Sequence, residues 1–158
     1  MEINIGIEKG NQQQVAQKLS LILADTYVLY VKTQNFHWNI IDPRFYFLHL
    51  FLEKQYEELA EGIDELAERI RMLGQRAPGS LKEFLEISSL NENGSDKETH
   101  GDAILNTLLA DRMALCRYIR KSIEESQELG DEGSADLLIK HLRMHENMVW
   151  MIHSHFKF

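Results

Sequence analysis

The segment from residue 42 to residue 74 reads DPRFYFLHLFLEKQYEELAEGIDELAERIRMLG and predicts a long amphipathic helix. Asp42 and Pro43 form a typical helix start, an N-cap residue followed by a proline at the first helical position. Gly74 stands where a glycine commonly follows the last helical turn. Apolar residues recur between them at intervals of three and four, which is the helical period: Phe45, Leu48, Phe51, Leu52, Tyr56, Leu59, Ile63, Leu66, Ala67, Ile70 and Leu73.

A second long helix is predicted upstream, from just after Asn11 to about His37. Gln14 follows Asn11 at the spacing of a capping box, which favours a helix start at this point. We therefore expect a short N-terminal tail of about ten residues. The apolar stripe of this helix consists of Val15, Leu19, Ile22, Leu23, Tyr30 and Val31.

Downstream of Gly74, capping signals mark one short helix and two long ones. Ser80 and Glu83 form a capping box at the start of a short helix over residues 81–87. Ser95 and Glu98 repeat this pattern before a long helix that closes at Gly130. The last helix is expected to start within residues 131–134.

These elements predict an all-α fold, a four-helix bundle with a short extra helix between the second and third long helices. Alternating strand patterns are essentially absent from the 158 residues. A crossover of roughly 20 residues allows the second and third helices to run parallel. No linker or internal repeat is evident, so residues 1–158 are expected to form a single domain.

Candidate metal ligands lie along the second helix. His49 and Glu53 are four residues apart, as are Asp64 and Glu68, so each pair shares a helical face. Glu53 and Asp64 are eleven residues apart, which is roughly 16 Å along the helix axis. A two-metal site needs its ligands within about 8 Å of one another, because the metals lie about 3.5–4 Å apart. One chain cannot close such a site, but two antiparallel copies related by a two-fold axis can.

The alternative for these carboxylates is a solvated acidic face, because the same helix carries Glu57, Glu58, Glu61 and Glu65. The combination with histidine favours metal binding over that alternative. Asp64 and Glu68 also border the apolar stripe, where an unpaired carboxylate is costly.

Three motifs together resemble the Dps mini-ferritins, the DNA-binding proteins from starved cells. They are Asn35-Phe36-His37-Trp38-Asn39, His49 twelve residues after His37, and Asp64-Glu65-Leu66-Ala67-Glu68-Arg69. The resemblance extends over nearly the whole chain, including Ser80-Leu81-Lys82-Glu83-Phe84-Leu85 and His145-Glu146-Asn147-Met148-Val149-Trp150-Met151. It implies a ferritin-like fold and a hollow homododecamer.

The resemblance further implies a di-iron ferroxidase centre at a two-fold interface, with His37, His49 and Glu53 from one chain and Asp64 and Glu68 from its mate. Its activity would be oxidation of Fe(II), typically with hydrogen peroxide, and storage of the ferric mineral, which protects against oxidative stress. One departure is Glu53, since the family more often has aspartate there.

Other residues carry two interpretations each. Trp38 is either a sacrificial electron donor near the iron or an aromatic residue that packs at the interface. Asp131 and Asp136 either line an acidic iron-entry pore, as in many family members, or stabilise a helix N-terminus. No histidine has glutamate three residues before it, so the intrasubunit site of conventional ferritins is not encoded.

We expect the remaining histidines and the single cysteine to have no site role. His141 and His145 are interpreted as polar surface residues, although their spacing of four could bind a transition metal. His153 and His155 are expected to be exposed. Cys116 is interpreted as a small buried hydrophobe.

The charge of the chain disfavours nucleic acid as a partner. Its net charge is −8 and its pI is about 5.3, and twelve such chains would carry about −96. Lys9 and Lys157 are the only cations near the two ends, so no basic tail is available for DNA phosphates. No signal peptide or membrane span is predicted, and the protein is expected to be cytoplasmic.

Overall fold

The structure, a computed structural model, describes residues 4–92 and 97–156. Across these two ranges it contains helices and no strands, which confirms the all-α prediction. The helices are α1 (Lys9–Asn39), α2 (Phe45–Met72), α3 (Leu81–Ile87), α4 (Gly101–Glu128) and α5 (Glu132–His153).

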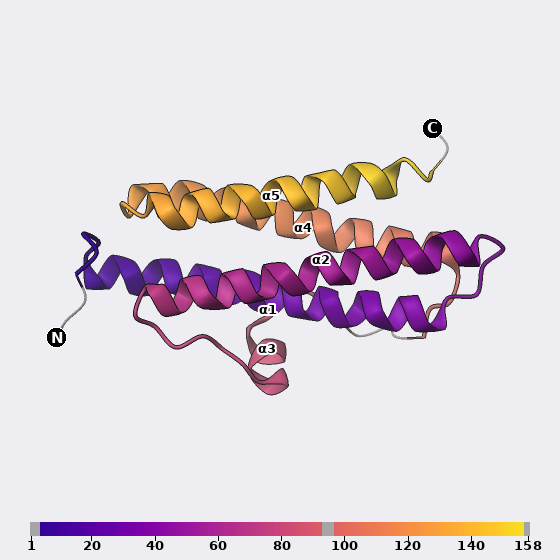
Figure 1. The fold of residues 1–158 in the computed structure, drawn as a ribbon, viewed down its shortest axis with the longest axis horizontal. Helices are drawn as coiled ribbons and strands as arrows, with labels where there is room; N and C mark the ends of the chain where they lie inside the picture. Colours follow the sequence, from indigo (N-terminus) through magenta and orange to yellow (C-terminus); the bar gives the residue numbers. More distant parts are fainter. Residues whose placement is uncertain (1–3, 93–96, 157–158) are drawn as a thin grey trace.

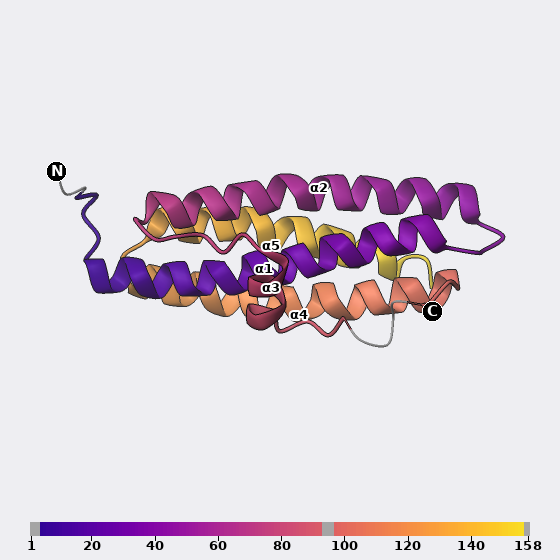
Figure 2. The same ribbon diagram turned by 90° about the horizontal axis from the view of Figure 1, so that it is seen from below.

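The four long helices form two antiparallel pairs, α1 with α2 and α4 with α5 (Figure 1). The connection from α2 to α4 returns along α1 to the opposite end of the bundle, and α3 lies against α1 midway (Figure 2). As a result α2 and α4 run parallel, which confirms the predicted crossover.

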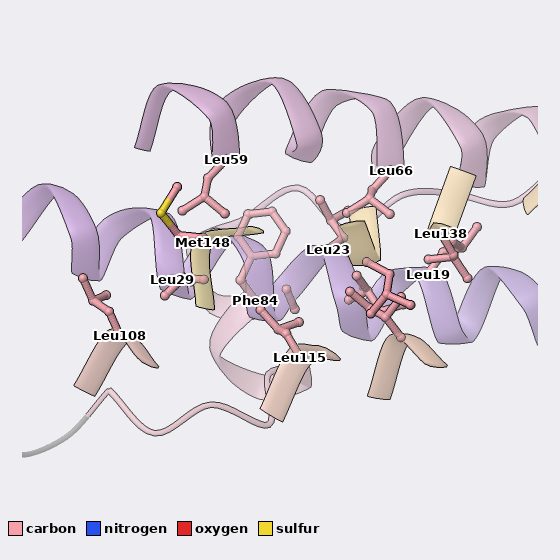
Figure 3. Packing of buried hydrophobic residues seen from close by; sticks show 14 of the residues in the cluster. Leu19, Leu23, Leu29, Leu59, Leu66, Phe84, Leu108, Leu115, Leu138 and Met148 are labelled. Carbon is pink, nitrogen blue, oxygen red and sulfur yellow. The ribbon is translucent and has the colours of Figure 1, made fainter. Parts of the chain in front are cut away.

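Leucine dominates the interior of the bundle. Leu19, Leu23 and Leu29 of α1 face Leu59 and Leu66 of α2, and the second pair of helices closes the core from the other side (Figure 3). Burial of this apolar surface supplies the main drive for folding, at about 25 cal/mol per Å². Leu108, Leu115, Leu138, Met148 and Phe84 complete the central layers.

Gly74 and Gly130 end α2 and α4 as predicted. Their φ angles are 77° and 75°, a conformation in which glycine has no steric penalty. The N–H of Gly74 donates to the carbonyl of Arg71, and the N–H of Gln75 donates to that of Ile70. Two carbonyl groups of the last turn are thereby satisfied in the Schellman pattern.

The starts of α1 and α2 differ from the predictions by three and two residues. α1 begins at Lys9, and the Asn11 side chain, expected to cap it, donates instead to the Leu129 carbonyl at the end of α4. α2 begins at Phe45, because Asp42 and Pro43 form a preceding turn in which the Asp42 carbonyl accepts from the Phe45 N–H. Short polar side chains satisfy alternative backbone partners, which shifts such boundaries.

The other capping signals have separate outcomes. The capping box of Ser80 and Glu83 is present at the start of α3. Ser95 lies outside the described residues, whereas the Glu98 carboxylate accepts from the N–H groups of Thr99 and His100 just before α4.

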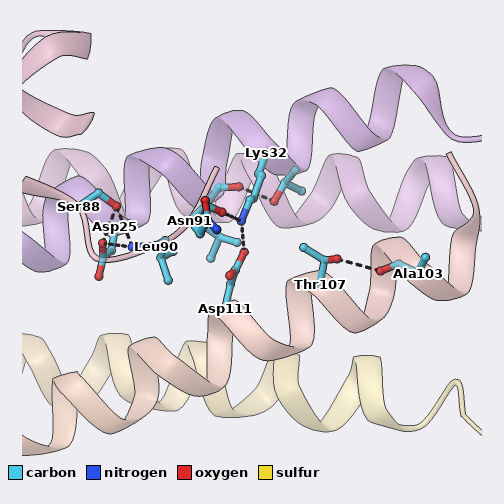
Figure 4. A network of polar contacts seen from close by, with 10 residues as sticks. Asp25, Lys32, Ser88, Leu90, Asn91, Ala103, Thr107 and Asp111 are labelled. Carbon is cyan, nitrogen blue, oxygen red and sulfur yellow. Dashed lines mark hydrogen bonds and ion pairs between the residues drawn. The ribbon is translucent and has the colours of Figure 1, made fainter. Parts of the chain in front are cut away.

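The crossover is fixed to the bundle by a buried carboxylate on α1. Asp25 accepts hydrogen bonds from the backbone N–H groups of Ser89 (2.6 Å) and Leu90 (3.2 Å), which directly follow α3 (Figure 4). It also accepts from the hydroxyl groups of Ser88 and Ser89, each at 2.7 Å. The Asp25 side chain thus takes the place of water as the acceptor for backbone N–H groups of this loop, which would otherwise be unpaired.

A second buried group ties the same loop to α4. Lys32 of α1 donates to the carbonyl of Asn91 and to a carboxylate oxygen of Asp111, both at 2.7 Å (Figure 4).

Within the described ranges, none of the helices combines the length and apolarity that a bilayer span requires.

Candidate metal centre

His37 and His49 lie side by side where the α1–α2 hairpin turns. The Nδ1 of His37 is 2.8 Å from the carbonyl oxygen of His49, and the Nδ1 of His49 is 2.9 Å from the carbonyl oxygen of His37. The helical donor for the His37 carbonyl would be the N–H of Ile41, but this N–H bonds to Thr99. The His37 carbonyl, which has no backbone donor from its own helix, therefore accepts from the His49 ring and orients it.

These two hydrogen bonds determine the tautomer of both rings. A carbonyl oxygen only accepts, so each Nδ1 carries the hydrogen and donates it. In the neutral rings each Nε2 then has a free lone pair, the arrangement found in metal-binding histidines. The rings stack with centroids 3.8 Å apart at 15°. His37 and His49 thus form a preorganised pair of nitrogen donors.

Aromatic rings enclose this pair. Tyr56 meets His37 edge-on at 5.3 Å, and Phe45 stacks on His49 at 5.0 Å. Desolvation, followed by the charges of Glu53 and Glu57, raises the pKa of the Tyr56 phenol, which therefore stays protonated at neutral pH. Sequence patterns identified Tyr56 and Phe45 only as apolar positions, although their spacing of seven and four from His49 places them on its face.

The predicted carboxylates do not join the histidines within one chain. Glu53 lies one turn beyond His49 and is half-buried, whereas Asp64 and Glu68 are exposed farther along α2. The eleven residues between Glu53 and Asp64 correspond to roughly 16 Å of regular helix. In the part of the chain that the structure describes, no three His, Cys, Asp or Glu side chains gather closely enough to hold a metal.

Exposed apolar residues surround the hairpin turn. Trp38 is 66% exposed, next to the buried His37. Ile41, Tyr46 and Phe47 are also exposed, at 73%, 77% and 53%. A group of large apolar side chains of this kind commonly marks a protein interface. Both interpretations of Trp38, as an electron donor and as an aromatic residue that packs at an interface, require a side chain that is exposed beside His37. Both stay predictions.

The structure corrects the pore assignment for Asp131. This carboxylate is only 1% exposed. It accepts from the backbone N–H and hydroxyl of Ser134 and pairs with Arg69 at 2.6 Å. It therefore caps α5, which was the alternative interpretation, and has no free face with which to line a pore. Asp136 is exposed and remains a candidate for the acidic entry.

The interpretation of two further histidines as surface residues is wrong. His141 is 2% exposed and His145 is fully buried. His155 contacts the ring of Phe51 and is only partly exposed, whereas His153 is exposed as expected. Cys116 is partly rather than fully buried, and burial raises the pKa of its thiol.

Comparison with known proteins agrees with this architecture. The family model described as a ferritin-like domain matches residues 16–157. The DNA protection during starvation protein 2 of Bacillus anthracis is 35% identical over 89% of this chain and 94% of its own length. A corresponding protein of Porphyromonas gingivalis is 34% identical over 93% of this chain and 91% of its own.

A solved structure of similar shape is the Dps protein of Vibrio cholerae O1, described as a member of a broad superfamily of ferritin-like diiron-carboxylate proteins. It has a TM-score of 0.93 and 32% identity and covers 99% of this chain and 98% of its own. The Dps protein of Bacillus brevis has a TM-score of 0.90 and 32% identity, covering 96% and 100%. The chain belongs to the Dps family of ferritin-like proteins, the iron-storing mini-ferritins.

Proposed function

We propose that this protein is a ferroxidase that binds its substrate, Fe(II), in pairs at sites shared between two chains. His37 and His49 with Glu53 supply one half of each site, and Asp64 and Glu68 of a two-fold mate supply the other. The observation that carries this proposal is the reciprocal hydrogen bonding that leaves both Nε2 lone pairs free. Imidazole and carboxylate ligands together suit Fe(II) and its harder Fe(III) product.

The exposed carboxylates and the apolar surface support sharing between chains. Among the described residues, no histidine completes a metal-binding group with Asp64 and Glu68, and no carboxylate completes one with His37 and His49. Trp38, Tyr46 and Phe47 offer an apolar surface beside the histidines for a second copy. An isologous two-fold contact would bring each half-site against the complementary half.

Hydrogen peroxide is the proposed oxidant. Two Fe(II) ions give one electron each to one peroxide molecule, which takes two protons and yields two water molecules and two Fe(III). Because both electrons leave together, no hydroxyl radical is released. Within this step His37 and His49 hold the substrate ions, and Tyr56, whose phenol stays protonated, packs edge-on against His37 and supports its ring.

Twelve chains are proposed to enclose a cavity in which ferric mineral is stored, in the cytoplasm. Asp136, exposed in the second turn of α5, is the remaining candidate for guiding iron to an entry pore. The iron chemistry would protect the cell against oxidative damage.

The names of the relatives favour a second candidate function, protection of DNA by direct association. The net charge of −8 argues against it, because bound phosphates must be matched by lysine and arginine. Iron oxidation is therefore the primary proposal.

Subunit mixing tests the shared site. The variants His37→Ala/His49→Ala and Asp64→Ala/Glu68→Ala should each be inactive when assembled alone. In hybrids formed at equal ratio, half of the interfaces pair unlike chains, and each of these regains one of its two sites. Peroxide-dependent Fe(II) oxidation, followed as ferric absorbance, should return to about a quarter of the wild-type rate.

The matched control mixes His37→Ala chains with His49→Ala chains. Both changes lie in the same half-site, so no combination restores an intact site and activity should stay absent. Equal rates in the two mixtures, or no recovery in properly assembled hybrids of the first, would contradict the shared site.

A further inference from the structure

A polar pocket of about 130 Å³ lies between α2 and α5, away from the histidine pair at the hairpin turn. Three of its side chains are carboxylates and one is a lysine, so its lining carries a net charge of about −2 at neutral pH. A pocket of this volume holds a few small ligands or waters. It is lined by Glu58, Glu61, Gly62, Glu65, Lys140, His141 and Met144.

The imidazole of His141 is the buried wall of this pocket. Its Nε2 is 3.3 Å from the Oε2 of Glu65. This is within ion-pair distance, yet neither ring nitrogen makes a hydrogen bond of acceptable geometry. Burial lowers the pKa of His141, so the ring is neutral and has a lone pair available at pH 7.

Gly62 provides the space in which this ring sits. A Cβ at Gly62 would lie 3.0 Å from Cε1 and 3.5 Å from Nδ1 of His141, so any larger residue would press on the imidazole. Gly62 lies on α2 between Glu58 and Glu65. The missing side chain therefore lets the imidazole enter between two carboxylates that are two helical turns apart.

The separation of nitrogen and oxygen matches two ligands of one metal ion. Bonds from a zinc-like ion to imidazole nitrogen and to carboxylate oxygen are about 2.1 Å long. At a tetrahedral angle these bonds place the two ligand atoms about 3.4 Å apart. The observed separation of His141 Nε2 and Glu65 Oε2 is 3.3 Å.

The neighbouring groups support this arrangement. The other oxygen of Glu65, Oε1, accepts a hydrogen bond from Lys140, which orients the carboxylate so that Oε2 faces His141. Glu58 has a buried Oε2 without a hydrogen-bond partner. Glu61 lies one turn before Glu65 on the same helical face. Two further oxygen donors therefore line the same space.

We propose that this α2–α5 pocket binds one divalent transition-metal ion of the Zn²⁺ class per chain, through His141 Nε2 and Glu65 Oε2. Among the described residues no third ligand is in place beside these two. Binding of the ion therefore requires Glu58 and Glu61 to move inward and complete its coordination. The ion would neutralise the excess negative charge of the lining. This site lies within one chain and does not depend on the proposed ferroxidase centre.

The test uses the assembled protein in a His49→Ala/Asp64→Ala background, which removes both halves of the proposed ferroxidase site. Isothermal titration with Zn²⁺ should still give one ion per chain in this background. Adding His141→Leu or Glu65→Gln should abolish this binding or weaken it by more than about tenfold. X-ray absorption of the zinc-loaded background protein should detect one imidazole and several oxygen ligands.

His153→Leu and Glu124→Gln are the matched controls, because they remove an exposed histidine of α5 and an exposed carboxylate of α4. Both should leave the binding unchanged. Circular dichroism and size exclusion verify folding, and Glu65→Gln stays informative if His141→Leu does not fold. Absence of zinc binding in the background protein, or equal binding by the Glu65→Gln variant, would overturn the proposal.

Discussion

Replacement of His145 by asparagine should remove a defined part of the acid sensitivity of the fold. His145 is fully buried, and its Nδ1 is 3.2 Å from a guanidinium nitrogen of Arg112. Because arginine only donates, Nδ1 is the acceptor and the ring is neutral. Desolvation, followed by the charge of Arg112 and the electrostatic interaction with His141, places the pKa of His145 well below its usual 6.5.

The sign of the effect follows from this direction. As the pH falls below about 6.5, His145 binds a proton in the unfolded chain but not in the folded protein, so the free energy of unfolding decreases. Its contribution is fully present above pH 6.5 and is lost as the pH falls toward the folded-state pKa. If the folded ring stays neutral to pH 5, the loss between pH 7.5 and pH 5 is about 2 kcal/mol.

The assay is urea unfolding at pH 7.5 and pH 5 with chelator present, for wild type and His145→Asn. Asparagine retains an acceptor near the position of Nδ1 but does not titrate. The variant should be less stable than wild type at pH 7.5. Between pH 7.5 and pH 5, however, it should lose about 2 kcal/mol less of its free energy of unfolding than wild type does. His153→Asn, which removes an exposed histidine of the same helix, should behave as wild type. An unchanged pH dependence in His145→Asn would refute this reasoning.

Three further outcomes are expected. Asp25→Ala should lower the free energy of unfolding by about 3 kcal/mol in urea titrations, because two backbone N–H groups of the crossover lose their buried acceptor; Asp25→Asn should lose less. Spin trapping should show fewer hydroxyl radicals from Fe(II) and peroxide with wild type than without protein. If radicals do appear with wild type, Glu53→Asp should suppress them by restoring the shorter ligand. Gel retardation should show no binding of duplex DNA at neutral pH and about 0.15 M salt; tight, salt-sensitive retardation would contradict this.

Local signals predicted most of the fold because they act over a few residues. The φ angles of Gly74 and Gly130 and the capping box at Ser80 depend on their immediate neighbours, so their positions in the sequence were sufficient. The start of α1 was misplaced because Asn11 bonds to Leu129, 118 residues away. A partner at such a distance leaves no trace in a short sequence window.

The burial of His141 and His145 was not predicted, because histidine is usually a surface residue and its position in the helical period was not considered. The core positions of α5 include Leu138, Leu142, Met148 and Ile152. His141 and His145 continue the same spacing, and Arg112 occupies the corresponding register on α4. A polar residue at an apolar register position was thus the signal that could have identified this cluster.

The same residue type has different chemistry at two levels of this bundle because its hydrogen-bond partner differs. At the hairpin turn, the carbonyl oxygen of each histidine accepts from the Nδ1 of the other, His37 or His49, so both Nε2 atoms are free to bind metal. In the middle of the bundle Arg112 donates to Nδ1 of His145, so the hydrogen is on Nε2, which cannot act as a ligand in that form. His141 has neither partner, and its position against Glu65 is what separates it from His145 as a candidate ligand. Spacing of histidines on a helix therefore identifies candidates, while the groups that face the two ring nitrogens select those that can bind a metal.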